Sequence, residues 1–325
     1  MPQRTTRRRV ADIAYQASST VRTELPVSGK IRKLYLELTG TLNLSNASGA
    51  TAVARNPGTV VPNITVYLDR EVVLKQGRWN DWRDRSYMHY KLPTEVSDDT
   101  SVNATAIASR IEIPFITPYA VRPVDTVLDM DAGQRLDIEV QWGNESSIIN
   151  GGTKNWTVNP SIAVVAEISR FDPEPIGIYK ELAFDSSNLG TAANADLELP
   201  LVTGNKKSYH HIFLVSENDP GAAGRGLVAT VLNDVRVQQS GSGEVSDAFG
   251  RITGSQLQND FNMYFSKPDA VQVGLYPIPF QAEFDGRNTF NLDTTDLDDL
   301  RVIVDHSAYA NAGYIRVLNG IIERL

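Results

Sequence analysis

The stretch Val124–Trp142, VDTVLDMDAGQRLDIEVQW, decides the fold that we expect for this chain. Its second half alternates, with Leu136, Ile138 and Val140 on one side and acidic or amide side chains on the other. A period of two residues indicates a β-strand with one buried face. The Asp- and Gly-containing segment before it is typical of a turn that joins two strands. We therefore expect a strand, a turn and a half-buried strand.

The same pattern returns 164 residues further along the chain. Leu128-Asp129 precedes Leu136 by eight residues, and Leu292-Asp293 precedes Leu300 by eight. Repeats of this period are whole domains rather than solenoid units, so two similar domains in tandem are expected. Three further pairs of segments occur in the same order in both halves of the chain. In chain order they are Glu24-Leu25-Pro26 with Glu198-Leu199-Pro200, 64–69 with 229–234 as a looser match, and Ile113-Pro114-Phe115 with Ile278-Pro279-Phe280.

Composition indicates a folded protein of about two domains. The chain has 325 residues, of which 41% are hydrophobic and 22% charged. We expect no transmembrane helix, because no apolar run approaches 18 residues, and no signal peptide, because residues 10–15 are a short stretch that contains Asp12. The absence of cysteine excludes disulfides, thiolate zinc sites and cysteine catalysis, and it is compatible with assembly in a reducing cytoplasm.

The charge of the chain is distributed unevenly. The net charge is −8, yet the first nine residues hold Arg4, Arg7, Arg8 and Arg9 and no acid. We expect residues 1–23 to be a basic N-terminal arm, with residues 10–21 as a short helix. An acidic body will not bind nucleic acid non-specifically, whereas the arm is suited to anionic lipid headgroups or nucleic acid.

The rest of the chain indicates an all-β fold. Each half contains about six to eight strand patterns separated by loops rich in turn residues, which favours Greek-key crossings. We expect two tandem eight-stranded jelly-roll β-barrels, the first over 24–172 and the second over 173–325. Helical spacing is confined to Gly77–Tyr90 and Gly254–Met263. Pro114 and Pro279 fall inside strand patterns, which predicts sheet edges or bulges.

The sequence contains no catalytic motif that we recognise, and we expect no enzyme. His210 and His211 are adjacent in a strand pattern, so their rings are expected on opposite faces, unable to ligate one metal together. Asp129 and Asp131 resemble the start of a calcium loop, but Gly133 and Val140 occupy positions where that loop needs oxygen ligands. They are weak calcium candidates, and a polar turn is the better interpretation.

Aromatic residues leave a second interpretation open. Trp79 and Trp82 stand at helical spacing near Tyr87 and Tyr90, and such a cluster is able to stack against sugars. Core or interface packing is the more common role of such residues. A carbohydrate-binding or glycan-cleaving double jelly-roll protein is therefore the alternative from another functional class.

The strand patterns also resemble a known family. The segments that carry the resemblance are Lys30–Leu44, Asn63–Val73, Tyr209–Val215, Leu227–Val237, Leu297–Asp305 and Tyr314–Ile322. Together with the tandem repeat and the basic arm, they are similar to the double jelly-roll major capsid proteins of tailless, membrane-containing icosahedral bacteriophages, the corticovirus and tectivirus type.

The resemblance implies a structural role rather than an active site. It implies a homotrimer that forms pseudo-hexameric capsomers and an icosahedral capsid over an internal viral membrane. The basic arm would face that membrane, and the other partners would be minor capsid or vertex proteins, with no specific nucleic acid. The protein would be made in the host cytoplasm and reside in the virion. A minor vertex or spike protein of the same virus type is a further alternative.

Overall fold

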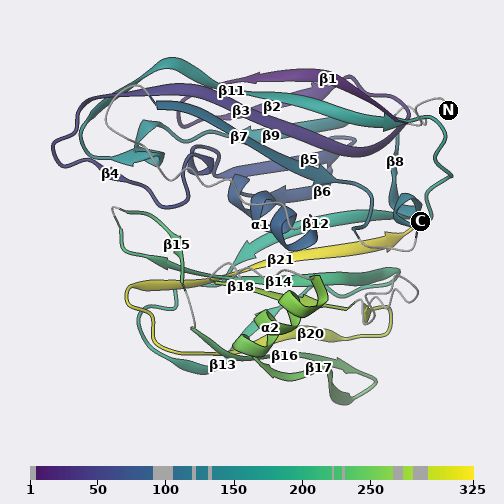
Figure 1. Ribbon diagram of the computed structural model, residues 1–325. Helices are drawn as coiled ribbons and strands as arrows, with labels where there is room; N and C mark the ends of the chain where they lie inside the picture. Colours follow the sequence, from purple (N-terminus) through teal and green to yellow (C-terminus); the bar gives the residue numbers. More distant parts are fainter. Residues whose placement is uncertain are drawn as a thin grey trace. The chain divides into compact units, whose positions relative to one another are not determined.

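A computed structural model describes residues 5–90, 105–118, 122–130, 134–221, 223–228, 231–265, 274–280 and 292–325. The chain forms two compact units with interleaved bounds. The first consists of Met1–Pro118, Arg122–Leu182 and Gly221–Gly224, and the second of Tyr119–Val121, Ala183–Pro220 and Arg225–Leu325. Figure 1 shows that strands dominate both units. Among the described residues, no helix combines the length and apolar character that a membrane crossing requires.

One sheet of the first unit is built on two long antiparallel strands. The order is β1-β11-β3-β7, and a short strand, β8, also pairs with β3 (Figure 1). Side chains along β3 alternate between buried and accessible over much of its length, as a strand with one buried face requires. The bounds are β1 Thr5–Ala14, β3 Lys30–Asn46, β7 Thr105–Pro114, β8 Leu128–Asp129 and β11 Thr153–Ser169.

The other sheet of this unit contains the stretch from which the fold was predicted. Leu136, Ile138 and Val140 are fully buried on β9, which confirms the predicted face. The order is β2-β9-β5-β6-β12, and the two sheets share one apolar core. The bounds are β2 Thr20–Leu25, β5 Asn63–Leu68, β6 Val72–Gly77, β9 Leu136–Gln141 and β12 Gly177–Asp185, of which the part up to Leu182 belongs to this unit.

Short elements complete the first unit. The helix α1 runs from Trp79 to Tyr90, where the spacing of the tryptophans predicted helical structure. Trp79 and Trp82 are both fully buried, so this helix packs its aromatic side against the core. The remaining elements are β4 Thr51–Ala52, β10 Ile149–Asn150, and the 3-10 helices η1 Gly58–Val60, η2 Pro123–Thr126 and η3 Glu145–Ser147.

The second unit repeats this arrangement. One sheet has the order β13-β20-β16-β17, and in the other β14 pairs with β15, β18, β19 and β21. The predicted second helix is present as α2 Gly254–Phe265. The strand bounds are β13 Asn194–Pro200, β14 Lys207–Asp219, β15 Gly226–Leu227, β16 Leu232–Gly241, β17 Glu244–Thr253, β18 Leu275–Pro279, β19 Leu292–Asp293, β20 Asp299–His306 and β21 Ala312–Arg324.

Strand pairing confirms the main sequence repeat. Ile113 lies opposite Leu34 on β3, and its counterpart Ile278 lies opposite Ile212 on β14. Leu128 and Leu292 likewise pair with equivalent positions of the same two strands. The proline that follows each isoleucine ends its strand, and β7 is an edge strand in the sheet order, as expected.

The looser match between 64–69 and 229–234 is wrong by about six residues. Leu68 lies opposite Leu136, the residue that the repeat aligns with Leu300. Leu300 lies opposite Gln239, so Gln239 rather than Asn233 occupies the place of Leu68 at the end of β5. The stretch from Gln239 to Leu300 is seven residues shorter than that from Leu68 to Leu136, so one constant offset misaligns this segment. Strand register follows cross-strand pairing rather than distance along the chain.

Two further expectations need correction. The double jelly roll is confirmed as the fold, but its sheets have open edges and do not close into barrels. The short helix expected over residues 10–21 is wrong, since β1 and β2 are strands joined by a turn. β1 pairs with β11 from Thr5 to Ala14, and Ile13 is buried in the core. The energy of pairing and burial overrides the weak helical spacing of this segment.

Candidate functional site

The predicted basic residues lie on β1. Arg7 Nη2 donates to the Tyr35 hydroxyl at 2.9 Å, and Arg7 Nε lies 3.3 Å from Glu167 Oε2. Arg9 Nε donates to Asp12 at 3.0 Å. Arg8 is exposed and forms no ion pair with any residue that the structure describes.

These arginines do not converge on one point, because neighbouring residues of a strand face opposite sides. The side chains of Arg7 and Arg9 are 59% and 64% exposed, so their ion pairs are weak and screened by solvent. Arg4 lies outside the described residues. The basic segment is therefore an accessible cationic strip along a strand, and its role toward a membrane stays a prediction.

β1 is also an edge strand. Within the described part of the chain it pairs only with β11, and its register shifts between Arg9 and Ala11. The backbone N–H and C=O groups along its other side are therefore available to a further strand. Most of its residues are exposed or half-buried, with Ile13 as the buried exception.

A buried ion pair joins β6 to β12. Glu181 is the parallel partner of Lys75, and the Lys75 Nζ lies 3.2 Å from Glu181 Oε2. Both side chains are completely buried. Burial lowers the pKa of Lys75 from 10.5 to about 8, and the attraction of the Glu181 carboxylate opposes that shift. The Tyr179 hydroxyl donates to Glu181 at 3.0 Å, and the Tyr179 ring lies 4.0 Å from Lys75 Nζ.

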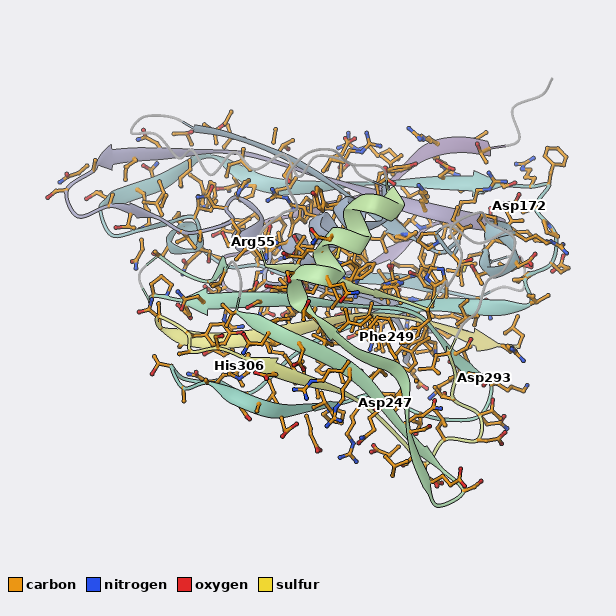
Figure 2. The ribbon with its side chains drawn as sticks, turned by 60° about the horizontal axis from the view of Figure 1, so that its bottom comes forward. Arg55, Asp172, Asp247, Phe249, Asp293 and His306 are labelled. Atoms are coloured by element: carbon orange, nitrogen blue, oxygen red, sulfur yellow. The ribbon has the colours of Figure 1, made fainter. Side chains whose placement is uncertain are left out.

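Helix α1 adds further charge to this region. Arg85 Nη2 donates to the Leu182 carbonyl at 2.8 Å, and Arg85 Nε lies 4.0 Å from Glu181. Arg55, labelled in Figure 2, donates to both oxygens of Asp84 at 2.6 Å. Sequence reasoning missed this network, because a charged helix is usually a solvated one and nothing local marks these residues as buried. The network fixes the strand β12 beside β6.

A second open edge lies on β17. This strand ends the order β13-β20-β16-β17 and pairs only with β16 among the described residues. Glu244 and Asp247 are exposed on it, and neither forms an ion pair with a described residue. Val245 is 66% exposed, a high value for a valine in a strand. β17 is thus an acidic, accessible edge, and Figure 2 labels Asp247 and Phe249 on it.

The calcium candidates receive no test from this arrangement. Asp129 lies on β8 opposite Lys30, and Asp131 falls outside the described residues. In the part of the chain that the structure describes, no group of three His, Asp or Glu side chains is placed to hold a metal ion. Calcium binding by Asp129 and Asp131 remains a proposal, testable by titration of the protein with calcium after treatment with a chelator.

The expected separation of His210 and His211 is wrong. Their Nδ1 atoms lie 3.0 Å apart, and the rings meet edge to face with centroids 5.3 Å apart. The register of β14 against β21 shifts between Tyr209 and His211, and such a bulge rotates one side chain out of strict alternation. Both histidines are buried, so they belong to the interior of the second unit.

The proposed sugar-stacking face is not on the surface. Trp79 and Trp82 have no solvent exposure, and Trp79 Nε1 donates to the Ser109 hydroxyl at 2.9 Å. Tyr87 is 7% exposed. A sugar needs exposed ring faces to stack against, so this cluster acts in core packing, as the more common interpretation predicted.

Comparisons with known proteins identify the fold. No family model matches the chain, and no curated protein matches it. Among solved structures, the major capsid protein of Sulfolobus turreted icosahedral virus has a TM-score of 0.71 and 14% sequence identity, with 98% of this chain and 97% of that chain covered. The likeness therefore lies in the three-dimensional arrangement rather than in the sequence.

Other matches extend over the whole chain too. The major capsid protein P2 of bacteriophage PM2 has a TM-score of 0.63, 12% identity and coverage of 99% and 98%. PBCV-1 VP54 has a TM-score of 0.64, 12% identity and coverage of 99% and 94%. These matches confirm the double jelly-roll fold of viral major capsid proteins. The same fold is thus found in a bacteriophage and in viruses of other kinds.

Proposed function

We propose that this chain is a major capsid protein that trimerises into pseudo-hexameric capsomers and builds an icosahedral viral shell. The observation that carries the proposal is the full-length likeness to a viral major capsid protein, with 98% of this chain and 97% of the other covered. The protein would reside in the virion after synthesis in the host cytoplasm.

Trimerisation is supported by the internal repeat. Each chain carries two units with the same strand order, so three chains present six similar units. A three-fold trimer of that kind has a nearly hexagonal outline and tiles a lattice with a single type of chain. Such a protein acts through its surfaces, and we propose no enzymatic activity for it.

Contact with an internal lipid membrane is a second part of the proposal. Arg4, Arg7, Arg8 and Arg9 would face anionic headgroups, which attract basic residues held near the membrane surface. The exposure of Arg7 and Arg9 supports this role, because a weak surface ion pair yields readily to a phosphate group. Minor capsid proteins at the vertices would be the remaining partners.

The first test is assembly of the purified chain. Light scattering should give a trimer of about three times 35.8 kDa, and electron microscopy at high protein concentration should show particles or sheets. A chain that stays monomeric at all concentrations and forms no particles would refute the proposal. The copy number in purified virions separates a major shell protein, present in hundreds of copies or more, from a vertex or spike protein.

The membrane role has a separate test with a matched control. Arg7, Arg8 and Arg9 changed together to Gln should weaken binding to vesicles with anionic lipid, and high salt should abolish the difference. The control changes Arg70, Arg170 and Lys206 to Gln, which are exposed residues that alter the net charge equally. Equal loss of vesicle binding in both variants would mean that net charge, rather than the basic strand, is responsible.

A further inference from the structure

Two pairs of strands occupy equivalent places in the repeat. β1 begins the first repeat and lies beside β11. β12 begins the second repeat, and just beyond its end the Ser186 N–H donates to the Ile315 carbonyl of β21 at 2.8 Å. β6 follows β2, β9 and β5 in one sheet, and β17 follows the equivalent strands β13, β20 and β16 in the other. The strand that pairs with the far edge of β6 therefore indicates which kind of strand would pair with the open edge of β17.

That strand is β12, the first strand of the second repeat. It runs parallel to β6 with Glu181 beside Lys75, and the buried ion pair between them closes the contact. β6 therefore has a neighbour on each side, β5 and β12. By the same comparison, two strands lack a further neighbour among the described residues. They are β1, the first strand of the first repeat, and β17, the strand of the second repeat that is equivalent to β6.

Both of these strands have an open edge. β1 and β17 are each ten residues long, and each pairs with a single strand among the residues described. Neither contains a proline or lysine, the residues that most often protect an exposed edge from pairing. Both strands show a register shift against their single partner, yet each offers an open edge of ten residues, which is a template for strand addition by another chain.

The two edges have opposite charge. β1 carries Arg7, Arg8 and Arg9 against one acid, Asp12, whereas β17 carries Glu244 and Asp247 against one base, Arg251, which is paired with Asp234 of β16. Arg8, Glu244 and Asp247 are exposed and form no ion pairs with described residues. Complementary charges of this kind favour pairing of β1 with β17 over pairing of either strand with its own copy.

We infer that β1 of one copy adds in parallel to β17 of a second copy, as β12 adds to β6 within the chain. The inference rests on the proposed function, and it specifies the contact that holds the trimer together. Because it joins two different strands, the contact is head-to-tail and leaves each chain with one donor and one acceptor strand. Such contacts close into a ring when the rotation allows, and the proposed trimer is the ring of three.

Pairing within the sheets supplies the register on β17. Lys75 lies opposite Val66 on β5, and Phe249 lies opposite Val237 on β16. Val66 pairs with Ile138 of β9 and Val237 pairs with Val302 of β20, and the repeat aligns Ile138 with Val302. Phe249, labelled in Figure 2, is therefore the counterpart of Lys75.

The register on β1 follows in the same way. Ile13 and Ser186 occupy the same place beside β11 and β21. Arg8 precedes Ile13 by five residues, and Glu181 precedes Ser186 by five. The pair Glu181 and Lys75 thus corresponds to Arg8 of one copy and Phe249 of the next, to within one residue because β1 contains a bulge. This register brings Asp247 close to the arginines of the partner strand.

Disulfide cross-linking tests the register directly, because the natural chain has no cysteine. Arg8→Cys is combined in turn with a single cysteine at each position from 244 to 251, and the proteins are oxidised mildly. Covalent trimers should form with cysteine at 249 or an adjacent position, on the order of a hundredfold faster than at 244, since the paired residues are held in contact. Arg8→Cys alone is the control and should give no dimer.

The outcomes separate this inference from the proposed function. A wild-type trimer by light scattering together with no cross-link at 248–250 would overturn the inference and leave the capsid proposal intact. Dimers from Arg8→Cys alone would overturn it in favour of β1 pairing with β1. A chain that never forms trimers or particles would overturn both. As an independent check, Asp247→Arg should raise at least about tenfold the protein concentration at which half of the chains are trimeric. Adding Arg8→Asp to the same chain should restore the wild-type concentration.

Discussion

The buried pair of Lys75 and Glu181 gives the sharpest prediction about stability. Both side chains are fully buried with the charges 3.2 Å apart, so their attraction at an effective dielectric of about 20 is roughly 5 kcal/mol. Replacement of Lys75 by Met leaves the Glu181 carboxylate buried with fewer partners, and breaking such a pair costs about 3–5 kcal/mol. We expect a value near 3, because Tyr179 and Arg85 still interact with Glu181.

A double-mutant cycle measures this term. Lys75→Met, Glu181→Leu and the double variant are unfolded in urea at one protein concentration. Tryptophan fluorescence follows the first unit alone, because all four tryptophans lie in it: Trp79, Trp82, Trp142 and Trp156. The double variant should recover at least about 2 kcal/mol of the summed losses, since it leaves no unpaired buried charge. Single losses below about 1 kcal/mol, or strictly additive losses, would refute the reasoning.

Three further predictions concern buried residues of the two units. Leu136→Asp and Leu300→Asp should each prevent folding of their unit, because both leucines are fully buried; soluble variants with the native mass by light scattering would contradict this. Asp137→Asn should cost about 1–3 kcal/mol in urea unfolding, since it weakens contacts with Arg22 and Arg135, whereas an unchanged midpoint would mean that solvent replaces them. Between pH 8 and 10.5 the folded chain has released the Lys75 proton that the unfolded chain retains, so wild-type stability should rise relative to Lys75→Met as pH increases; a parallel pH profile of the two proteins would contradict it.

The strands were predictable where burial alternates locally. Leu136, Ile138 and Val140 show their buried face in the sequence itself, and Leu300 and Val302 show the equivalent one. The repeat was visible because equivalent strands keep similar residues at turns and strand ends. Pairing through β3 and β14 confirms it at positions such as Ile113 and Ile278.

Other features depend on contacts between distant residues. Val10, Ile13, Ala14 and Ala17 have helical spacing, yet the segment pairs with β11, which lies about 150 residues later. Such pairing is invisible in a local window, so the helix prediction for this segment failed. His210 faces His211 because of a bulge set by the partner strand, which the sequence of β14 alone does not specify.

The candidate site was only partly predictable for the same reason. Charge along Arg7, Arg8 and Arg9 is plain in the sequence, but its position on an edge strand is not. Lys75 and Glu181 are 106 residues apart, and nothing near either one marks a buried pair. Sequence reasoning finds residues of the right chemistry, whereas the sheet order determines which of them meet.

The interleaved bounds of the first unit have a consequence for synthesis on the ribosome. That unit lacks its last segment until Gly221–Gly224 has been made, since Ala54 donates to the Ala223 carbonyl at 2.7 Å. At about 5–20 residues per second, the intervening stretch 183–220 takes roughly 2–8 s to translate. The first unit therefore matures while the second is already being synthesised, and a gene truncated between the repeats would encode an incomplete core rather than an independent half.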